Sequence, residues 1–407
     1  VAQELGVASK INIAHIGVAR QGAFSVGNCK GQNQIAFADV NPAYLNALKK
    51  DHPDAQYYTD YREMLAKLGD KLDAVVVATP DHVHAPAAIA AMKLGLHCYS
   101  EKPLGHDIHQ IRAMRKIAKD KKLITQMGTQ IHAEDNFRRV VELVQAGAIG
   151  TVTDVKIWCA NRYIGSKTPK PAPTPEGFNW DVWLGPAAER DFDERYVPGT
   201  WRHYWDFGNG AMGDMCCHYL DLPYWALGLT YPLSIETTSP NPVEDELCGW
   251  DLTAKFEFAP QPGAKAPLTL SWQDGQARPE CLQELGVDKH GAGVLFFGTD
   301  GILFSTYYEH ALLPKERFEG FERPAQSIPK SLGHHAEWIK AIQDGAAPDA
   351  TTCNFEYSGK IAESALLGCF SYRCGQKLIY DSEKAQATNC PEAAKYFKQY
   401  YRPGWEV

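Results

Sequence analysis

The sequence predicts two domains: an N-terminal α/β domain built on a doubly wound parallel sheet, and a C-terminal α+β domain with a large, mostly antiparallel sheet. Three observations support this prediction. Segments typical of strands and helices alternate as far as residue 127, an order that produces parallel sheets. The segment Asp73–Ala78 is almost entirely apolar, as strands buried on both faces are. Thr151–Ala160 alternates apolar and polar residues, which is typical of a half-exposed antiparallel strand.

Local signals define the elements of the first domain. The apolar segment Ile11–Val18 predicts the first strand. Asn41-Pro42 is typical of a helix start, with Asn as N-cap and Pro at the first helical position, and Thr59 or Asp60 can cap a helix through Leu68. The remaining elements expected here are a strand over Gln34–Val40, a helix through Leu94, a strand over His97–Ser100, a helix over Ile108–Lys121 and a strand over Leu123–Met127.

The pattern changes after about residue 130. We expect a helix over Glu134–Ala146, closed by Gly147, and an extended loop where residues 169, 171, 173 and 175 are all proline. The other expected elements are strands over Leu252–Phe258, Leu268–Trp272, Val294–Phe297 and Ile302–Tyr307, then helices near His334–Asp344 and Tyr357–Tyr372. We therefore place the two domains at residues 10–130 and 131–407.

Aromatic residues concentrate in the segment 178–231. They occupy 13 of its 54 positions, more than twice the share of 11% found in the whole chain. Two interpretations remain open at this point. The rings form a well-packed core, because aromatic side chains dominate core burial, or they form flat surfaces on which a sugar binds.

Charge and hydropathy exclude several classes of protein. The chain has 41 Lys and Arg against 49 Asp and Glu, a net charge of −8. Nucleic-acid binding depends on positive fields, so we expect no nucleic-acid partner. No stretch approaches the ~18 consecutive apolar residues of a membrane span, so we expect no membrane insertion.

The 11 cysteines are an odd number and contain no C-x-x-C pair. A disulfide framework or a thiolate zinc site is therefore weakly supported, and we expect most cysteines to be buried as small apolar side chains.

The chain begins at Val1 rather than Met. A removed signal peptide would favour the periplasm, whereas the odd cysteine count favours the cytoplasm; the expectation leans slightly to the periplasm.

The first strand continues into Gly17-Val18-Ala19-Arg20-Gln21-Gly22, a variant of the dinucleotide fingerprint G-x-G-x-x-G with Ala19 as its middle residue. The first glycine permits a tight turn, and the last permits close packing of helix on strand. Asp39 ends the second strand, 22 residues after Gly17, where a carboxylate binds the ribose diol and repels a 2′-phosphate. This pattern favours NAD over NADP. The alternative for Asp39 is a capping or turn residue.

Two further motifs are candidates for catalysis. Glu101-Lys102 follows a predicted strand on the side where open α/β sheets bind ligands; the alternative is a surface turn. In a helix, Asp214, His218 and Asp221 share one face. The alternatives there are a capping aspartate with a core histidine, or a zinc site that two or three mixed ligands specify poorly.

These motifs together resemble those of the glucose–fructose oxidoreductase/inositol dehydrogenase family, also called Gfo/Idh/MocA. The resemblance extends over nearly the whole chain. It rests on the glycine turn, Asp39, the segment Thr79-Pro80-Asp81 with His82 and His84, Glu101-Lys102-Pro103, and Gly210 with the Asp214, His218 and Asp221 helix. It implies an NAD-binding Rossmann domain and a second domain for substrate binding and oligomerisation, with a homodimer or homotetramer as the expected assembly.

The resemblance implies a role for each matching residue. Those expected to bind the cofactor are Gly17, Ala19, Arg20, Gln21, Gly22, Asp39, Thr79, Pro80, His84, Glu101 and Lys102. Those expected to catalyse are Lys102, Asp214 and His218, with no metal. Two departures matter: Ala19 replaces the middle glycine, and Cys216 stands where the family often has glycine.

The expected function is oxidation or reduction of a hydroxyl-bearing carbon of a sugar, glycoside or cyclitol by NAD(H). His218 is the expected base, because the unperturbed pKa of histidine lies near neutrality. Polar groups and flat rings suggest the substrate contacts Gln130, Arg162, Tyr163, Trp180, Trp201, Arg202 and Asp206. The alternative is a glycoside hydrolase that keeps NAD bound and uses Tyr163 or His203 as an extra base. A non-catalytic NAD-binding regulator is a third possibility, against which the intact Lys102, Asp214 and His218 set argues.

Overall fold

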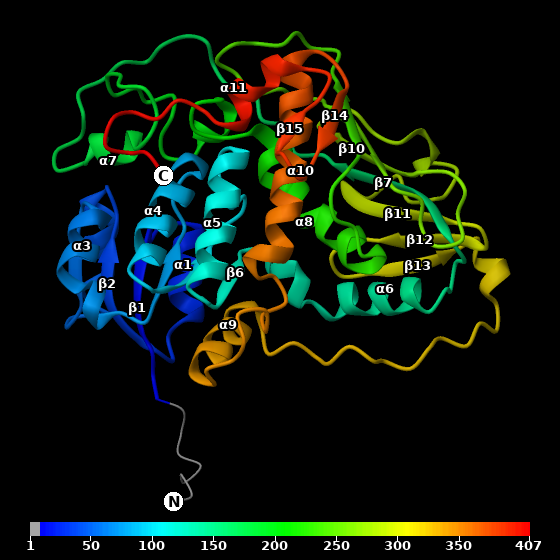
Figure 1. Ribbon diagram of the computed structural model, residues 1–407, viewed down its shortest axis with the longest axis horizontal. Helices are drawn as coiled ribbons and strands as arrows, with labels where there is room; N and C mark the ends of the chain where they lie inside the picture. Colours follow the sequence, from blue (N-terminus) through cyan, green and yellow to red (C-terminus); the bar gives the residue numbers. More distant parts are fainter. Residues whose placement is uncertain (1–8) are drawn as a thin grey trace, which may run out of the picture.

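The computed structural model describes residues 9–407 and confirms the predicted fold class (Figure 1). Val1, on which the expectation of a removed signal peptide rests, lies outside the described residues. The N-terminal part is a six-stranded sheet in the order β3-β2-β1-β4-β5-β6, with parallel pairing throughout. Its strands are β1 Asn12–Ile16, β2 Asn33–Ala38, β3 Gln56–Tyr58, β4 Ala74–Val77, β5 His97–Ser100 and β6 Thr125–Met127.

The helices of this domain begin where the sequence predicts capping residues. Asn41 accepts a hydrogen bond from the Ala43 N–H at the start of α2, and Asp60 accepts one from the Arg62 N–H at the start of α3. The helices are α1 Gln21–Asn28, α2 Pro42–Leu48, α3 Tyr61–Leu68, α4 Asp81–Lys93 and α5 Ile108–Asp120. The short strand β3 is not among the elements expected from the sequence, because three residues carry too little periodicity to be recognised.

The C-terminal part contains a nine-stranded sheet in the order β13-β12-β11-β7-β10-β9-β8-β14-β15. Its strands are β7 Val152–Cys159, β8 Ser234–Thr238, β9 Thr253–Phe258, β10 Leu268–Asp274, β11 Ala292–Gly298, β12 Gly301–Ser305, β13 His310–Leu313, β14 Leu378–Asp381 and β15 Gln386–Ala387. The sheet is mostly antiparallel, as predicted. Strand β7 corrects one detail: it is antiparallel to β11 but parallel to β10, so it lies inside the sheet with both edges paired.

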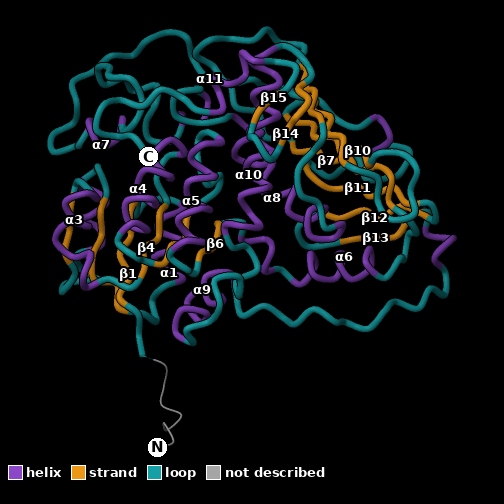
Figure 2. The backbone as a smooth tube through the Cα atoms, viewed as in Figure 1, coloured by secondary structure: helices purple, strands orange, loops and turns teal. Residues whose placement is uncertain are grey.

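Six helices follow the first domain in the chain. They are α6 Asp135–Gln145, α7 Trp180–Leu184, α8 Gly210–Leu227, α9 His334–Gln343, α10 Phe355–Cys374 and α11 Ala394–Phe397. One of them, α9, packs against the N-terminal sheet. The long helix α10 lies between the two sheets, where it contacts α5, α8 and β8 (Figure 2). Across the described residues 9–407, no helix combines the length and apolarity needed to cross a membrane.

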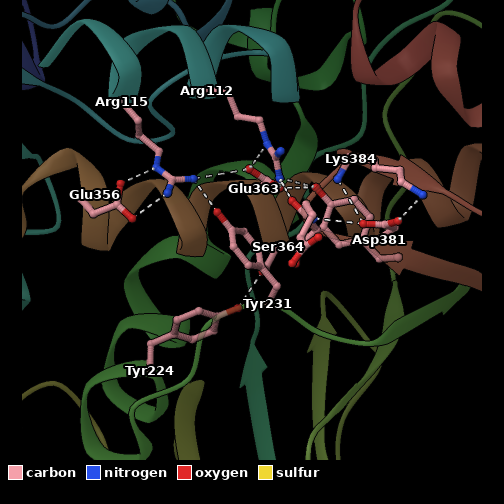
Figure 3. A network of polar contacts seen from close by, with 12 residues as sticks. Arg112, Arg115, Tyr224, Tyr231, Glu356, Glu363, Ser364, Asp381 and Lys384 are labelled. Atoms are coloured by element: carbon pink, nitrogen blue, oxygen red, sulfur yellow. Dashed lines mark hydrogen bonds and ion pairs between the residues drawn. The ribbon is translucent and has the colours of Figure 1, made fainter. Parts of the chain in front are cut away.

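A polar network joins the two parts across α5 and α10. Figure 3 shows Arg112 and Arg115 extending from α5 toward Glu363 and Glu356 on α10. Arg112 donates to both oxygens of Glu363, at 2.6 and 3.1 Å, and Arg115 donates to both oxygens of Glu356, at 2.7 and 3.2 Å. Glu363 is fully buried. Removing one member of such a buried pair is strongly unfavourable, so the network fixes how the α/β domain meets the second domain.

The aromatic segment 178–231 proves to be mainly core. Trp183, Tyr196, Trp201, Tyr204 and Phe207 are buried in one apolar cluster. Nine of the 11 cysteines are also buried, and none forms a disulfide, which confirms the expectation that most cysteines act as small apolar side chains.

Candidate active site

A cavity of about 490 Å³ opens at the carboxyl ends of β1 and β4. The sheet order reverses direction between these two strands, and open α/β sheets bind their ligands at such a point. The second domain closes the far side of the cavity through the loop after β7 and the first turns of α8. The cavity therefore lies between the two domains.

The glycine turn between β1 and α1 has the geometry that the fingerprint predicts. Gly17 has φ of +84°, and a Cβ there would lie 2.5 Å from the Ala78 carbonyl oxygen. A Cβ on Gly22 would lie 2.2 Å from the Gly17 carbonyl oxygen. Both contacts are too short for any side chain, so the two glycines are required for β1, β4 and α1 to pack this closely. Gly17, Ala19 and Gln21 line the cavity, whereas Gly22 is not among its lining residues.

Asp39 lies at the end of β2 and lines the same cavity. Its carboxylate accepts hydrogen bonds from the backbone N–H groups of Val18, at 3.0 Å, and Asn41, at 2.9 Å. Burial raises the pKa of Asp39 above its usual value, and these two hydrogen bonds oppose the change. The carboxylate thus has a turn role, while the N-cap of α2 is Asn41. Asp39 also lines the cavity, where the sequence predicts a ribose contact.

Glu101 lies at the end of β5 and is buried. Its Oε1 accepts hydrogen bonds from Gln130, at 2.7 Å, and Gln21, at 3.2 Å, whereas its Oε2 has no partner within the described residues. Burial raises the pKa of Glu101 to about 7. An unpartnered buried oxygen is costly, so the site is suited to a ligand that donates a hydrogen bond to Oε2. Gln130, predicted as a substrate contact, orients Glu101 and also lines the cavity.

Lys102 and Asp214 form a buried ion pair across the cavity floor. Lys102 follows β5, Asp214 lies in the first turns of α8, and their side chains are 11% and 10% exposed. Asp214 also accepts a hydrogen bond from the Tyr163 hydroxyl at 2.5 Å. Although burial alone favours the neutral forms, Asp214 holds the pKa of Lys102 above its usual value, and Lys102 and Arg202 hold the pKa of Asp214 well below its usual range. The pair is therefore charged at neutral pH.

His218 lines the cavity one helical turn after Asp214. Its Nδ1 is buried and has no hydrogen-bond partner within the described residues. Burial, and then the nearby Lys102 ammonium, lower the pKa of His218 to about 3, well below the unperturbed value that made it the expected base from the sequence. The ring is neutral at pH 7, and a neutral ring has one nitrogen free to accept a proton.

Asp221 is not part of the cavity. Its carboxylate faces His132, with 2.9 Å between the Asp221 oxygens and His132 Nδ1, and it accepts a hydrogen bond from the Tyr357 hydroxyl at 2.8 Å. The side chains of Asp214, His218 and Asp221 therefore do not converge on one point. Asp214 is bound to Lys102, and Asp221 is bound to His132. A zinc site formed by the Asp214, His218 and Asp221 face is excluded by this arrangement.

The structure brings most of the other predicted residues to the cavity. Those that line it are Arg20, Thr79, Pro80, His84, Gln130, Trp201 and Arg202. The buried His84 ring lies 2.7 Å from the carbonyl oxygens of both Thr79 and Pro103, so it connects the loops that follow β4 and β5.

Four predicted substrate contacts are not among the residues that line the cavity. One of them, Tyr163, instead donates a hydrogen bond from its hydroxyl to Asp214. Arg162 binds Asp251 through two hydrogen bonds of 2.7 and 2.8 Å, and Asp206 pairs with Arg190. Trp180 stacks on Trp183 and donates to the Arg190 carbonyl oxygen. Polarity and ring content alone suggested these residues, and neither property shows that a side chain already has a partner within the protein.

One residue that sequence reasoning missed is Asp81, the first residue of α4. It is buried, lines the cavity, and its Oδ2 has no partner within the described residues. Burial raises the pKa of Asp81 to about 7, which the nearby Arg202 and Lys102 partly oppose. Its position directly after Thr79-Pro80 was the signal that could have identified it. The apolar lining residues Phe178, Trp183, Phe192 and Met215 were also missed as site residues.

The fold and the cavity define a dinucleotide-binding protein of the oxidoreductase class. Residues 11–129 match the family model described as the oxidoreductase family, NAD-binding Rossmann fold, and residues 136–266 match that of the oxidoreductase family, C-terminal alpha/beta domain. The two matches together span more than half of the chain. The chain belongs to this family, Gfo/Idh/MocA, and its cofactor is NAD.

Individual relatives are more distant. A levoglucosan dehydrogenase of Pseudarthrobacter phenanthrenivorans is 25% identical over 192 residues, 47% of this chain and 42% of the relative. A glycosyl hydrolase family 109 protein of Shewanella amazonensis is 30% identical over 115 residues, 25% of each chain. The chain thus matches less than half the length of these curated relatives. The solved structure of GenD2 from gentamicin A biosynthesis, in complex with NAD, has a TM-score of 0.63 at 18% identity, covering 94% of this chain and 99% of that one, which shows the shared fold.

Proposed function

We propose that the protein is an NAD(H)-dependent dehydrogenase acting on a hydroxyl-bearing carbon of a sugar, glycoside or cyclitol. The observation that carries the proposal is the single cavity in which Asp39, Glu101, Lys102, Asp214 and His218 meet. The cofactor residues and the acid–base residues come from distant parts of the sequence, and a hydride transfer from a hydroxyl-bearing carbon needs both sets in one place.

The residues fit NAD. Gly17 has no Cβ at the point where the turn after β1 comes close to the end of β4 beside the cavity. Asp39 places a carboxylate at the same cavity. A carboxylate at this position binds a free ribose diol and repels a 2′-phosphate. The unpartnered Oε2 of Glu101 is available to accept a hydrogen bond from a ribose hydroxyl. The chemistry that NAD supplies when bound is acceptance of a hydride from the carbon that bears the hydroxyl.

The protein's own residues accept the hydroxyl proton and stabilise the charge that develops on the oxygen. Oxidation of an alcohol removes a proton from its hydroxyl together with the hydride, and the unpartnered, neutral His218 is the group available to accept that proton. Lys102 remains protonated beside Asp214, so it donates a hydrogen bond to the oxygen and stabilises the negative charge that develops there. Asp214 and the Tyr163 hydroxyl hold the Lys102 side chain in place.

The test is absorbance at 340 nm after NAD is added with a panel of free sugars, cyclitols and aryl glycosides. A dehydrogenase produces NADH in proportion to the substrate consumed. If no member of a broad panel reduces NAD while an aryl glycoside is cleaved, the protein is a hydrolase. If NAD binds and neither reaction occurs, the protein is a binding protein and the proposal is wrong.

The hydrolase alternative is supported by the match to a glycosyl hydrolase family 109 protein. Such chemistry needs a further base beside the sugar ring. Tyr163 donates its hydroxyl proton to Asp214, and burial with the Asp214 charge raises its pKa above the usual value. His203 stacks on Tyr163 and is not among the residues that line the cavity. Both observations favour the dehydrogenase.

We also propose that the protein forms a homodimer or homotetramer, as the resemblance to the family implies. Light scattering coupled to size-exclusion chromatography tests this: a single species at twice or four times 45.2 kDa supports it, and a monomer at micromolar concentration contradicts it.

A further inference from the structure

Arg202 lies beside Asp214 at the cavity and leaves its hydrogen-bond donors unused within the described residues, as does Arg20, the other arginine that lines the cavity. Arg202 lies in a short helical turn over Thr200–His203, stacks on the Trp201 ring at 4.2 Å, and lines the cavity with 28% of its side chain exposed. Within residues 9–407 its guanidinium donates no hydrogen bond. The nearest carboxylate contact is an ion pair of 3.5 Å between Arg202 Nε and Asp214 Oδ1.

Three arginines of the same region, outside the cavity lining, have acceptors for their guanidinium groups within the protein. Arg162 binds Asp251 through two nitrogens, and Arg195 binds Asp193 at 2.9 Å. Arg190 pairs with Asp206 and donates to a backbone carbonyl oxygen. Each of these has a carboxylate as its partner. Arg202 faces the cavity instead, and five N–H donors without acceptors suggest a partner that arrives with a ligand.

Asp214 does not fill this role. It accepts hydrogen bonds from the Lys102 ammonium and the Tyr163 hydroxyl, whereas its contact with Arg202 Nε, at 3.5 Å, is an ion pair without a hydrogen bond. The reacting end of the cavity carries two cationic side chains, Lys102 and Arg202, against the ionised Asp214 and two further buried carboxyl groups, Asp81 and Glu101. Burial raises the pKa of both Asp81 and Glu101 to about 7, so these two groups are only partly ionised at neutral pH.

We propose that Arg202 binds a carboxylate of the substrate, so that the substrate class is a sugar acid, such as a uronic acid or its glycoside. This inference rests on the proposed function. A guanidinium binds a carboxylate through two parallel hydrogen bonds, which would supply acceptors for the unused donors of Arg202. A phosphate would bring a second negative charge next to Asp214.

The geometry supports one ring bound between the two cations. Lys102 Nζ and Arg202 Nε both contact the same oxygen, Asp214 Oδ1. They are thus within the span of one hexose ring, so a substrate whose hydroxyl meets Lys102 can place its carboxylate on Arg202. Trp201 holds the guanidinium plane by stacking, which reduces the freedom that binding would otherwise remove.

The test compares matched pairs of ligands that differ only in the acid group. D-glucuronate with D-glucose, and D-galacturonate with D-galactose, are titrated into the protein–NADH complex by calorimetry, and NAD reduction is measured with the same four compounds. We expect at least one acid to bind about 10- to 100-fold more tightly than its neutral partner, the worth of a charge-assisted bidentate contact. Arg202→Gln should remove this preference, and Arg202→Lys should retain only part of it.

Arg190→Gln is the matched control, because it removes the same charge from the same segment outside the cavity. The NADH dissociation constant should be unchanged in both glutamine variants. If no acid binds more tightly than its neutral partner, or if Arg202→Gln weakens both members of a pair equally, the proposal is wrong. Loss of NADH binding in Arg202→Gln would overturn it by assigning Arg202 to the cofactor. Arg202-dependent binding of an acid without NAD reduction would support the carboxylate site while contradicting the proposed dehydrogenase function.

Discussion

Replacing Lys102 by methionine removes one charge from a buried pair while keeping most of the side-chain volume. Both side chains are about nine-tenths buried. Breaking such a pair from one side costs about 3–5 kcal/mol, because the remaining charge stays buried without its partner. Asp214 keeps the Tyr163 hydroxyl and the Arg202 charge, so the expected loss in the free energy of unfolding lies at the lower end, about 3 kcal/mol.

The double variant Lys102→Met/Asp214→Asn separates stability from chemistry. Because Asp214→Asn removes the carboxylate that Lys102→Met leaves without its partner, the double variant should regain most of the lost stability. NAD reduction should stay lower by ~10²–10⁴, the usual worth of a positioned acid–base group. Urea unfolding gives the first quantity and single-turnover NADH formation the second. NADH affinity is the control and should change little. An unfolding free energy of Lys102→Met equal to that of the wild type would refute the assignment of the pair as buried and charged.

Three further changes test other parts of the site. Asp39→Ser should reduce the preference for NAD over NADP, because a charge-assisted hydrogen bond is worth ~1.5–3 kcal/mol; equal binding of the two cofactors by the wild type, in fluorescence titration, would contradict the role of Asp39. Gly22→Ala should weaken NADH binding and lower the thermal midpoint, since its Cβ would lie 2.2 Å from the Gly17 carbonyl oxygen; Gly27→Ala, with open space around the new Cβ, is the matched control. Asp81 has its pKa raised by burial from 3.8 to about 7, so the folded protein holds a proton that the unfolded chain has lost, and stability should fall as pH rises from about 4 to 7. Asp81→Asn should flatten this slope and stabilise the protein above pH 7 by up to about 4 kcal/mol, and an unchanged slope in urea unfolding would count against it.

The sequence was sufficient for features that depend on neighbouring residues. The caps at Asn41 and Asp60, the buried strand β4 and the glycine turn at Gly17 all follow from local patterns. Short strands such as β3 and β15 were missed, because two or three residues show no periodicity. The parallel pairing of β7 with β10 was missed as well, since alternation along one strand does not reveal the direction of its partner.

The candidate site likewise combines features that the sequence predicts with features that it does not. Lys102, Asp214 and His218 were recognised through motifs, and the structure places all three in one cavity. Their charge states were not predictable, because they depend on burial and on contacts such as that between Lys102 and Asp214, 112 residues apart. Arg162 and Asp206 were misassigned for the same reason: each has an ion-pair partner, Asp251 or Arg190, that a polarity pattern does not reveal.

The central claim is that His218 accepts the substrate proton beside a charged Lys102–Asp214 pair. Single-turnover reduction of bound NAD, followed at 340 nm from pH 5 to pH 9 in the wild type and in His218→Ala, tests it most directly. Because burial lowers the pKa of His218 to about 3, whereas those of Glu101 and Asp81 lie at about 7, any inflection near neutral pH should persist in His218→Ala. That variant should be slower by ~10²–10⁴ across the range with NAD still bound. A His218→Ala protein that keeps the wild-type rate would contradict the account and leave another group as the base.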